Sequence, residues 1–402
     1  MRRALNVLYV SHTGHVSGAE LSLLDLVTAL PPAVRPVLAC PAAGPLAGRA
    51  AAAGVRTLPI AGTAGSLKVS PAQTSRAAAQ LALAAFQVAR AAVRVRADVL
   101  HANSVRAGLA AVPAGRLTGR PVVVHVRDRL PRGRVADASL RLAAAGRTVV
   151  LANSGYTAEG VTEVAPRAAV RTVHNAIDLA RFDPAGHDRD AARSVLGLPE
   201  GAFAAGVVGQ ISPWKGQLEA VEAVAELAGG HPGLHLLIVG EAKFVDAATR
   251  YDNPAYVARL RETIARRGLD GRVRLLGERD DVPAVLRALD VLLVPSWEEP
   301  FGRVVLEGMA MGVPVLATRT GGPAEIVTDG RDGLLLPPRA PGAWATALEQ
   351  VIGDARLRDA LARAGRRRAA DFSPDRHVAA VLAAYDASAR APRRPTHPDM
   401  VR

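Results

Sequence analysis

The stretch VLLVPSWEEPFGRVVLEGMAMGVPVLATRTGGP, residues 291–323, decides the fold. Its apolar start, residues 291–294, predicts a β-strand that Pro295 ends. A polar loop follows, then a helix at about residues 301–311 that Gly312 ends, and then a second apolar strand. Strand, loop, helix and strand in this order form a crossover unit of a parallel sheet. Ligands of such sheets bind beyond the carboxyl ends of the strands, where loop meets helix.

Two carboxylates mark this position. Glu299 lies in the loop, and Glu307 lies about a turn and a half into the helix. An ionised carboxylate only accepts hydrogen bonds, so two of them along one cleft suit the paired hydroxyls of sugar or ribose rings. The free N–H groups at the helix start suit an anion. For the pair alone, the alternative is a solvated loop acid beside a helix-surface glutamate.

The sequence around these two glutamates resembles that of one protein family. Glu299-Pro300-Phe301-Gly302, then Glu307, and then GVPVLATRTGGPAEIV and DGLLLPP resemble the E-x7-E signature of the retaining glycosyltransferases of family 4. The resemblance spans most of the chain, and its motifs come in the family's order. It implies the GT-B fold, an α/β architecture in which two Rossmann-like, doubly wound parallel-sheet domains face each other across a cleft.

The resemblance also implies the domain boundaries. We expect residues 1–182 to form an acceptor-binding domain and residues 183–376 to form a nucleotide-sugar-binding domain. A C-terminal helix at about residues 377–390 is expected to return to the first domain. Residues 183–201, rich in Asp, Arg, Gly and Pro, predict the hinge. The tail, residues 391–402, is rich in Pro and charge and is expected to be disordered.

Composition agrees with a globular protein of this size. The chain has 402 residues, enough for two α/β domains, with 49% hydrophobic and 22% charged residues. The single Cys40 excludes an internal disulfide and fits a reducing compartment, so we expect a cytoplasmic location. The N-terminal apolar run is interrupted by Asn6 and predicts a first strand rather than a signal peptide. The Ala-rich run at residues 77–89 is too short to cross a bilayer.

The formal net charge of +13 suits a nucleic acid, an anionic lipid or a phosphorylated ligand. Aromatic residues are only 3% of the chain and offer little for base stacking, so we expect no nucleic-acid partner. A long Ala/Arg helix is predicted at residues 71–96, where Arg90, Arg94 and Arg96 suit a membrane surface or an acidic acceptor. An ordinary solvated face is the alternative. Peripheral association with the inner face of a membrane therefore stays open.

In the first half, polar residues follow predicted strands. Ser17-Gly18-Ala19-Glu20 lies between a first strand and a helix and resembles the family's G-G-A-E loop, which faces the donor diphosphate. Ser17 replaces the usual first glycine. Residues 98–101 and 121–126 are strands whose ends carry the clusters HANS and HVRD. A lone histidine at a strand end is more often structural, but the resemblance implies that His125 contacts the donor sugar. As acceptor contacts we expect His101, Asn103, Arg127 and Asp128.

In the second half, Lys215 lies just before a predicted helix, so that its ammonium and the free N–H groups converge. This convergence suits a diphosphate leaving group. Where the family commonly has arginine this chain has Gln210, and Arg303 offers a replacement cation. The family's base-binding backbone corresponds to the loop near residues 281–282. The expected donor-binding residues are Ser17, Gly18, Gln210, Lys215, Asp281, Val282, Glu299, Phe301, Gly302, Arg303 and Glu307.

These residues predict transfer of a sugar from a nucleotide diphosphate sugar, with UDP favoured, to an acceptor hydroxyl with retention at the anomeric carbon. Glu299, His125 and Lys215 are the expected catalytic set, and Glu307 is expected to hold the ribose hydroxyls. No metal-ligand spacing is present. Asp188-Arg189-Asp190 has the letters of a D-x-D motif but falls in the expected hinge, where it predicts a solvated charge run. We expect no metal and no other cofactor.

Three alternatives remain at this point. The first is a GT-B nucleotide-sugar epimerase, which needs no acceptor. The second is a peripheral membrane enzyme that performs the same chemistry on a lipid acceptor. The third is a non-catalytic basic binding protein. The high Ala and Arg content fits a GC-rich bacterial genome, where acceptors range from secondary-metabolite cores to glycolipid and polysaccharide precursors.

Overall fold

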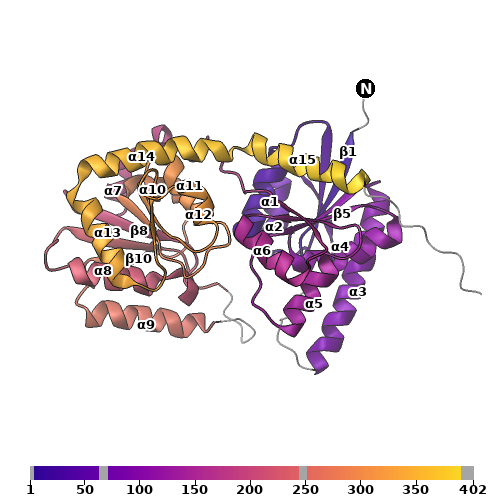
Figure 1. The fold of residues 1–402 in the computed structure, drawn as a ribbon, viewed down its shortest axis with the longest axis horizontal. Coiled ribbons are helices and arrows are strands. Elements are labelled where there is room, and N and C mark those ends of the chain that lie inside the picture. The colour runs from indigo at the N-terminus through magenta and orange to yellow at the C-terminus, as the bar shows by residue number, and fades with distance from the viewer. Residues whose placement is uncertain (1–3, 63–70, 244–250, 391–402) are drawn as a thin grey trace, which may run out of the picture.

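The computed structural model describes residues 4–62, 71–243 and 251–390, and Figure 1 shows two lobes side by side. The tail at residues 391–402, which the sequence predicts to be disordered, lies outside the described residues. Each lobe is built on one parallel sheet with helices on both of its faces. The GT-B expectation is confirmed at this level.

The first sheet has the strand order β3-β2-β1-β4-β5-β6-β7, and all its neighbouring strands are parallel. Strands such as VVVHV in β5 are buried at every position, as expected for a parallel sheet covered on both faces. The strands are β1 (Leu5–Val10), β2 (Val34–Cys40), β3 (Arg56–Pro59), β4 (Val99–Ala102), β5 (Val122–Val126), β6 (Val149–Ala152) and β7 (Ala169–Thr172).

Helices cover the two faces of this sheet in separate groups. One face packs against α3 (Pro71–Arg94), α4 (Val105–Thr118), α5 (Arg134–Ala143) and α6 (Gly155–Val164). The other packs against α1 (Gly18–Thr28), α2 (Pro45–Ala52) and the C-terminal helix α15 (Pro374–Arg390). Val378, Val381 and Tyr385 of α15 are buried there together with Val7 and Tyr9 of β1. The last helix of the chain therefore completes the core of the first domain.

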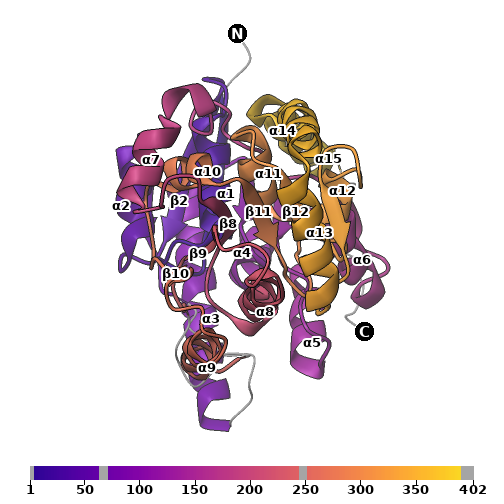
Figure 2. The same ribbon diagram turned by 90° about the vertical axis from the view of Figure 1, so that its left-hand side faces the viewer.

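The second sheet has the order β10-β9-β8-β11-β12-β13 and is also parallel. Its strands are β8 (Phe203–Val208), β9 (Leu234–Val239), β10 (Val273–Leu275), β11 (Val291–Val294), β12 (Val315–Thr318) and β13 (Leu334–Leu336). One face packs against α7 (Arg189–Val195), α10 (Val282–Ala288), α11 (Arg303–Ala310) and α14 (Ala355–Ala369). The other packs against α8 (Gln217–Leu227), α9 (Asn253–Arg266) and α13 (Pro341–Gly353), as the end-on view of Figure 2 shows.

The hinge predicted at residues 183–201 is wrong. This segment contains α7, which packs on α10 within the second domain. Arg189 and Arg193 of α7 form ion pairs of 2.6 and 3.2 Å with Asp290, so within the run at residues 188–190 Arg189 is not a solvated charge, while Asp188 and Asp190 are exposed. Asp188 accepts a hydrogen bond from the Ala191 N–H at 2.8 Å and caps the helix.

The chain crosses between the domains at two adjacent places instead. On the first crossing, Val173 belongs to the core of the first domain and Ile177 to the core of the second. The return crossing lies between Phe372 in the second core and Val378 in the first. The Ile177 N–H donates to the Phe372 carbonyl at 3.0 Å, so the two crossings run side by side. The pivot between the domains is thus a pair of short segments tied to each other.

Candidate active site

The loop that carries Glu299 is fixed by a second loop of the same domain. The Glu299 N–H donates to the Thr320 carbonyl at 3.2 Å, and the Gly322 N–H donates to the Glu299 carbonyl at 2.8 Å. Gly321 lies between these bonds with φ +97°, and a Cβ there would lie 2.2 Å from the Glu299 carbonyl oxygen. Only glycine allows this approach. We call residues 295–302 the donor loop.

Glu299 and Lys215 meet, although 84 positions separate them in the sequence. Lys215 Nζ lies 2.5 Å from Glu299 Oε2, and the Ser296 hydroxyl donates to the same oxygen at 3.0 Å. Lys215 ends the short 3-10 turn Pro213–Lys215 that leads into α8, and its ammonium lies 4.1 Å from the centre of the Trp214 ring. Both charged side chains are mostly buried. Ser296 and Trp214 are contacts that the sequence did not indicate.

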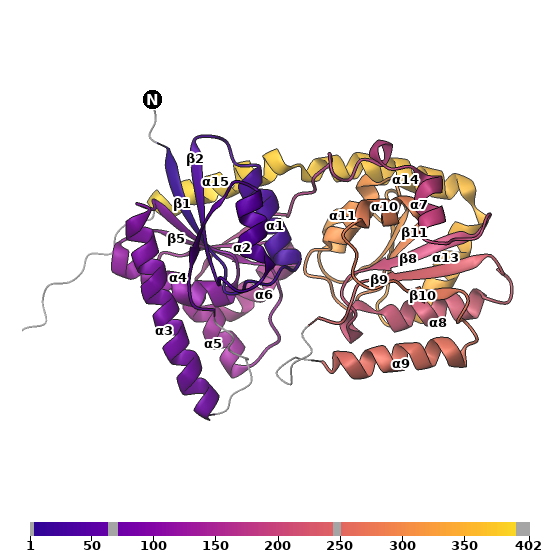
Figure 3. The same cartoon turned by 180° about the vertical axis from the view of Figure 1, so that it is seen from behind.

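Arg303 reaches across the cleft from the first turn of α11. Its guanidinium pairs with Asp25 of α1 at 2.7 Å and with Glu307 of its own helix at 3.6 Å. Burial raises the pKa of Glu307, while Arg303 and Arg181 oppose the increase. A Cβ at Gly18 would lie 4.0 Å from the Arg303 side chain. The start of α1 and the start of α11 therefore face each other between the domains (Figure 3).

The start of α1 is closed by a capping box. The Glu20 carboxylate accepts hydrogen bonds from the Ser17 N–H at 3.1 Å and the Ser17 hydroxyl at 2.5 Å. Ser17 therefore stabilises the helix start with its side chain, which the glycine at this position in the family pattern cannot do. The Gly18 position beside it carries no side chain and leaves the backbone open towards Arg303.

Three of the four predicted acceptor contacts, His101, Asn103 and Arg127, are buried inside the first domain. Arg127 donates to Asn103 at 2.9 Å and to Asn175 at 2.7 Å. His101 is fully buried and lies 2.7 Å from the Tyr385 hydroxyl of α15. His101 Nε2 and Arg127 Nη2 have no hydrogen-bond partner among the described residues, and contact of these residues with an acceptor stays a prediction.

Asp128, the fourth predicted acceptor contact, is exposed to solvent and lies between the domains. Desolvation of its carboxylate by the surrounding protein raises the pKa of Asp128. The negative charges of Glu20 and Glu299 raise this pKa further, while the charge of Lys215 opposes the increase. Of the four, it is the side chain that lies within electrostatic reach of the Lys215–Glu299 pair.

His125 lies in the interior of the first domain. Its ring centre is 5.6 Å from that of His101 and 6.1 Å from that of His377 on α15. Neither ring nitrogen has a hydrogen-bond partner. Burial lowers the pKa of His125, and the charge of Arg127 lowers it further, so the ring is neutral at pH 7. Its contact with a donor sugar stays a prediction.

The remaining donor-binding predictions lie at the carboxyl edge of the second sheet. Gln210 follows β8, and its carbonyl accepts a hydrogen bond of 2.9 Å from Gln217. Asp281 lies just before Val282, the first residue of α10. Its carboxylate accepts hydrogen bonds from Arg279 Nε at 2.7 Å and Nη2 at 2.6 Å, and these bonds lower the pKa of Asp281. Contact of their backbone with a base stays a prediction.

Phe301 is a core residue rather than a ligand contact. It is 2% exposed and packs against His174 and Phe372, with ring centres 5.9 and 6.2 Å away. Its side chain is therefore held in the core, and contact of its backbone with a donor stays a prediction. The adjacent Gly302 opens α11 with φ +97° and no side-chain cap. The free N–H groups that follow keep their capacity for an anion.

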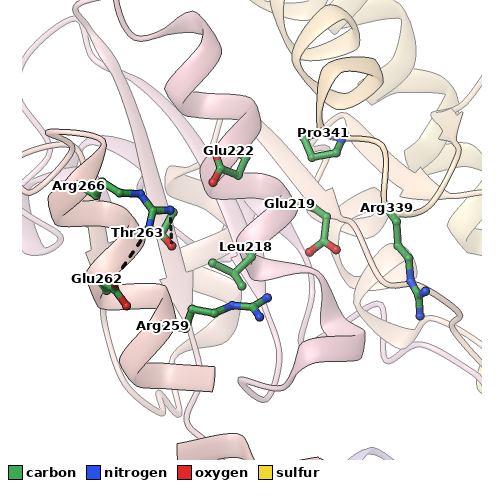
Figure 4. Close-up of a pocket in the computed structure, with 9 residues that line it drawn as sticks. All are labelled: Leu218, Glu219, Glu222, Arg259, Glu262, Thr263, Arg266, Arg339 and Pro341. Atoms are coloured by element: carbon green, nitrogen blue, oxygen red, sulfur yellow. Dashed lines mark hydrogen bonds and ion pairs between the residues drawn. The ribbon is translucent and has the colours of Figure 1, made fainter. Parts of the chain in front are cut away.

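A hollow outside the cleft is linked to the donor loop through contacts of two of its lining residues with Trp297. It lies between α8 and α9, and Trp297 of the donor loop reaches its edge by donating to Glu219 at 2.6 Å. Arg339 stacks on the same indole at 3.8 Å. None of its residues was predicted, and it contains neither Lys215 nor Glu299. Figure 4 shows its lining: Leu218, Glu219, Glu222, Arg259, Glu262, Thr263, Arg266, Arg339 and Pro341.

Sequence reasoning missed the residues that join the two domains at the donor loop, namely Ser154, Tyr156, His174, Glu298 and Glu325. Asn153-Ser154 is recognisable as a helix cap, and Glu325 belongs to the GGPAEIV motif. Their contact across the cleft has no signal in the sequence. Within the described parts of the chain, no group of three or more His, Cys, Asp or Glu side chains is placed to hold a metal. Metal independence stays a prediction.

The structure has two parallel-sheet domains that are joined by two adjacent crossings of the chain. A helix with free N–H groups suited to an anion begins on each side of the cleft. These features together define a GT-B glycosyltransferase. Residues 16–181 match the family model described as Glycosyltransferase Family 4, and residues 188–368 match the one described as Glycosyl transferases group 1. The chain belongs to the family 4 glycosyltransferases, whose second domain is the group 1 module.

Among curated relatives, the D-inositol 3-phosphate glycosyltransferase of Streptomyces avermitilis is 34% identical over 74% of this chain and 67% of its own length. The one of Salinispora arenicola is 36% identical over 54% of this chain and 49% of its own length. The chain thus spans about half the length of the first curated relatives it matches. Among solved structures, HepE of Anabaena in complex with UDP and glucose has a TM-score of 0.81 at 26% identity, covering 95% of this chain and 99% of HepE.

Proposed function

We propose that the protein transfers a sugar from a UDP-sugar to an acceptor hydroxyl with retention at the anomeric carbon. The observation that carries the proposal is the meeting of Lys215 and Glu299 opposite the start of α1. HepE has also been solved with UDP-glucose, at 26% identity over 95% of this chain, which supports a UDP-sugar as donor.

The pairing of Lys215 with Glu299 suggests how the donor is received. A diphosphate entering between the helix starts offers Lys215 a new anionic partner and frees Glu299 to accept hydrogen bonds from sugar hydroxyls. Glu307 accepts hydrogen bonds from the ribose hydroxyls. Arg303 compensates only partly for Gln210, because its guanidinium already pairs with Asp25 and Glu307.

The bond changes balance within donor and acceptor. The bond from the anomeric carbon to the phosphate oxygen breaks, and its electrons stay on the UDP that leaves. The acceptor oxygen forms the new bond on the same face, and its proton passes to an oxygen of the leaving phosphate. The main electrostatic task of the protein is to stabilise that phosphate, which Lys215 and the first N–H groups of α11 do. A double displacement would instead form a sugar adduct on a carboxylate.

The test is UDP release from UDP-glucose, with D-inositol 3-phosphate as the first acceptor because the curated relatives carry that name. The expected product has the α configuration at the anomeric carbon by NMR. A β product would overturn retention, and a trapped adduct on a carboxylate, seen by mass spectrometry, would overturn the same-face route. An epimerase would convert UDP-glucose with no acceptor present. If no sugar is transferred and the protein instead binds DNA tightly with a steep salt dependence, the non-catalytic alternative holds.

We also propose that the first domain binds an anionic membrane surface through α3. The outward face of this helix exposes Leu83, Phe86 and Val93 by 49%, 56% and 62%, and Arg90 lies over the Phe86 ring at 5.9 Å. Large exposed apolar side chains interleaved with arginines are typical of a helix that binds the surface of an anionic bilayer. They are not typical of an ordinary solvated helix face. In the part of the chain that the structure describes, no helix combines the length and apolar character that crossing a bilayer needs.

Flotation with vesicles tests this association. Binding to vesicles that contain an anionic lipid is expected to decrease with salt and with Phe86→Ser, while Leu117→Ser, which changes an even more exposed apolar side chain on α4, serves as the control. Equal binding of the protein and the Phe86 variant would overturn the assignment of α3.

A further inference from the structure

The N-terminus of α6 in the first domain contacts the donor loop of the second. The Ser154 hydroxyl, which precedes α6, donates to the Pro300 carbonyl at 2.5 Å. The Tyr156 hydroxyl donates to the Glu298 carboxylate at 2.7 Å. These two bonds hold the residues on either side of Glu299. The position of the donor loop therefore depends on the first domain as well as on its own.

Glu325 provides the strongest contact at this place. Its carboxylate accepts hydrogen bonds from the Gly155 N–H at 2.8 Å, the Tyr156 N–H at 3.0 Å and His174 Nε2 at 2.9 Å. The two amides are unsatisfied donors of the first turn of α6, and a negative charge at a helix N-terminus is favourable. Burial alone would raise the pKa of Glu325, but the bonds from His174 and the two amides outweigh it and lower the pKa. The carboxylate thus caps a helix that lies about 170 positions away.

Both ends of this contact are firmly placed. Glu325 lies in the short helix α12 (Pro323–Ile326), which directly follows Gly322, the residue whose N–H donates to the Glu299 carbonyl. Arg368 donates to the Glu325 carbonyl at 2.9 Å. His174 lies on the first crossing, and its carbonyl is 2.6 Å from His377 Nδ1 on the return crossing. A movement of α6 away from the second domain would break the bonds to Glu325 and the bonds to the donor loop together.

We infer that Glu325 is a positioning residue whose carboxylate holds the two domains together and thereby sets the donor loop in place for sugar transfer. We call Glu325 with Gly155, Tyr156 and His174 the domain latch. Its effect on turnover rests on the proposed function, whereas its effect on domain separation does not. Glu325 itself acts through the donor loop and need not touch the substrate.

Glu325→Gln tests the inference with almost no change in shape. The amide keeps one acceptor oxygen, and its NH2 group faces a donor where the second oxygen was, so at least one of the three bonds is lost. Glu325→Asp keeps the charge but shortens the side chain by one methylene group. Its domain separation and turnover are expected to be intermediate between those of the unmodified protein and those of Glu325→Gln. The matched control is Glu349→Gln, because Glu349 also lies opposite a histidine, His231 at 3.9 Å, but within one domain.

Domain separation is measured without any ligand. Leu117→Cys on α4 and Val195→Cys on α7 place spin labels at positions that are each 74% exposed, one in each domain, while the native Cys40 is buried. Pulsed electron resonance is expected to give a narrow distance distribution in this background and a broader, shifted one after Glu325→Gln. Glu349→Gln is expected to leave the distribution narrow. An unchanged distribution in the Glu325 variant would overturn the latch.

Turnover is measured with UDP-glucose as donor, together with the melting temperature. Loss of one charge-assisted bond is expected to lower kcat/KM about tenfold in Glu325→Gln, with the melting temperature unchanged. Tyr156→Phe, which removes only the bond to Glu298, is expected to lower kcat in the same direction. A changed distance with unchanged turnover would overturn the role in positioning. Absence of turnover in the unmodified protein would overturn the proposed function, and the distance experiment would still decide the latch.

Discussion

At the scale of single residues, the cleft is organised by charges that are already paired before any donor binds, within the second domain and, between Arg303 and Asp25, across the cleft. Lys215 pairs with Glu299, and Arg303 pairs with both Asp25 and Glu307. Each pair sets a cation beside a carboxylate that has a separate task in the proposed reaction. Removal of one member therefore leaves its partner uncompensated in a mostly buried place.

Lys215→Ala is expected to lower kcat about 100-fold or more, because it removes the cation that stabilises the leaving phosphate. The melting temperature is expected to fall as well, because Glu299 is left without its cation in a mostly buried place. UDP release from UDP-glucose measures the effect. Lys243→Ala is the control, because Lys243 forms a comparable 2.6 Å ion pair with Glu278 at the surface. Normal turnover of the Lys215 variant would remove this residue from the site.

Glu307→Gln addresses the carboxylate assigned to the ribose. Because burial raises the pKa of Glu307, its ionised form is lost at a higher pH than for a free glutamate. UDP affinity measured by calorimetry is therefore expected to fall as the pH decreases through that raised pKa. In the variant, affinity should be lower at pH 7 and should lose this dependence. A variant with the same affinity and the same pH profile would show that the ribose binds elsewhere.

At the scale of elements, α7 shows how a segment of loop-like composition becomes part of a domain. Its two arginines bind the carboxylate of Asp290, just before β11, and the Ala204 N–H at the start of β8 donates to the same carboxylate at 2.7 Å. This carboxylate therefore joins α7 to the two central strands of the second sheet.

Asp290→Ala is expected to lower the free energy of unfolding of the second domain by about 2–3 kcal/mol, because it leaves two part-buried guanidinium groups without their partner. Urea unfolding followed by the fluorescence of Trp214, Trp297 and Trp344, all in the second domain, measures the change. Asp280→Ala is the control, since Asp280 is 99% exposed and its contact with Arg49 is 3.7 Å long. An equal midpoint for both variants would contradict the role of Asp290.

At the scale of the whole molecule, the domains are tied by α15, by the two crossings and by the domain latch. Tyr385 of α15 lies 2.7 Å from His101 and donates to the Tyr9 hydroxyl at 3.0 Å, so the last helix closes the polar interior of the first domain. Burial lowers the pKa of His377 at the return crossing to about 4 and also lowers that of His101. These histidines stay neutral in the folded protein.

The stability of the molecule is therefore expected to depend on pH below neutrality. An unfolded histidine has a pKa of about 6.5, so between about pH 4 and about pH 6.5 the unfolded chain binds protons that the folded His377 does not. The free energy of unfolding should rise with pH across this window and level off above it. Urea unfolding as a function of pH measures the profile. His377→Asn is expected to flatten it, and an unchanged slope in this variant would contradict the buried neutral state of His377.

The sequence determined the features that local physical chemistry specifies. Apolar runs bounded by Pro and Gly gave the strands around Glu299 and the helix behind it, since a parallel strand must be apolar on both faces. The same pattern set Lys215 and Gly302 just before helices that follow strand ends, and Glu307 inside the helix that Gly302 precedes, which is where the structure has them. The motif order then implied two facing domains of GT-B type, which the structure confirms.

Only the tertiary structure decided which polar side chains face the cleft and which join the domains. His101 near the end of β4, and Asn103 and Arg127 just after β4 and β5, have the sequence pattern of site residues, yet they are buried against Tyr385 and Asn175 from distant segments. Glu325 looks like a surface acid of a short helix, but it caps α6 across the cleft. Periodicity reports the environment within a few residues. These pairings instead join residues 48, 170 and 284 positions apart, which meet only when the two sheets and α15 pack.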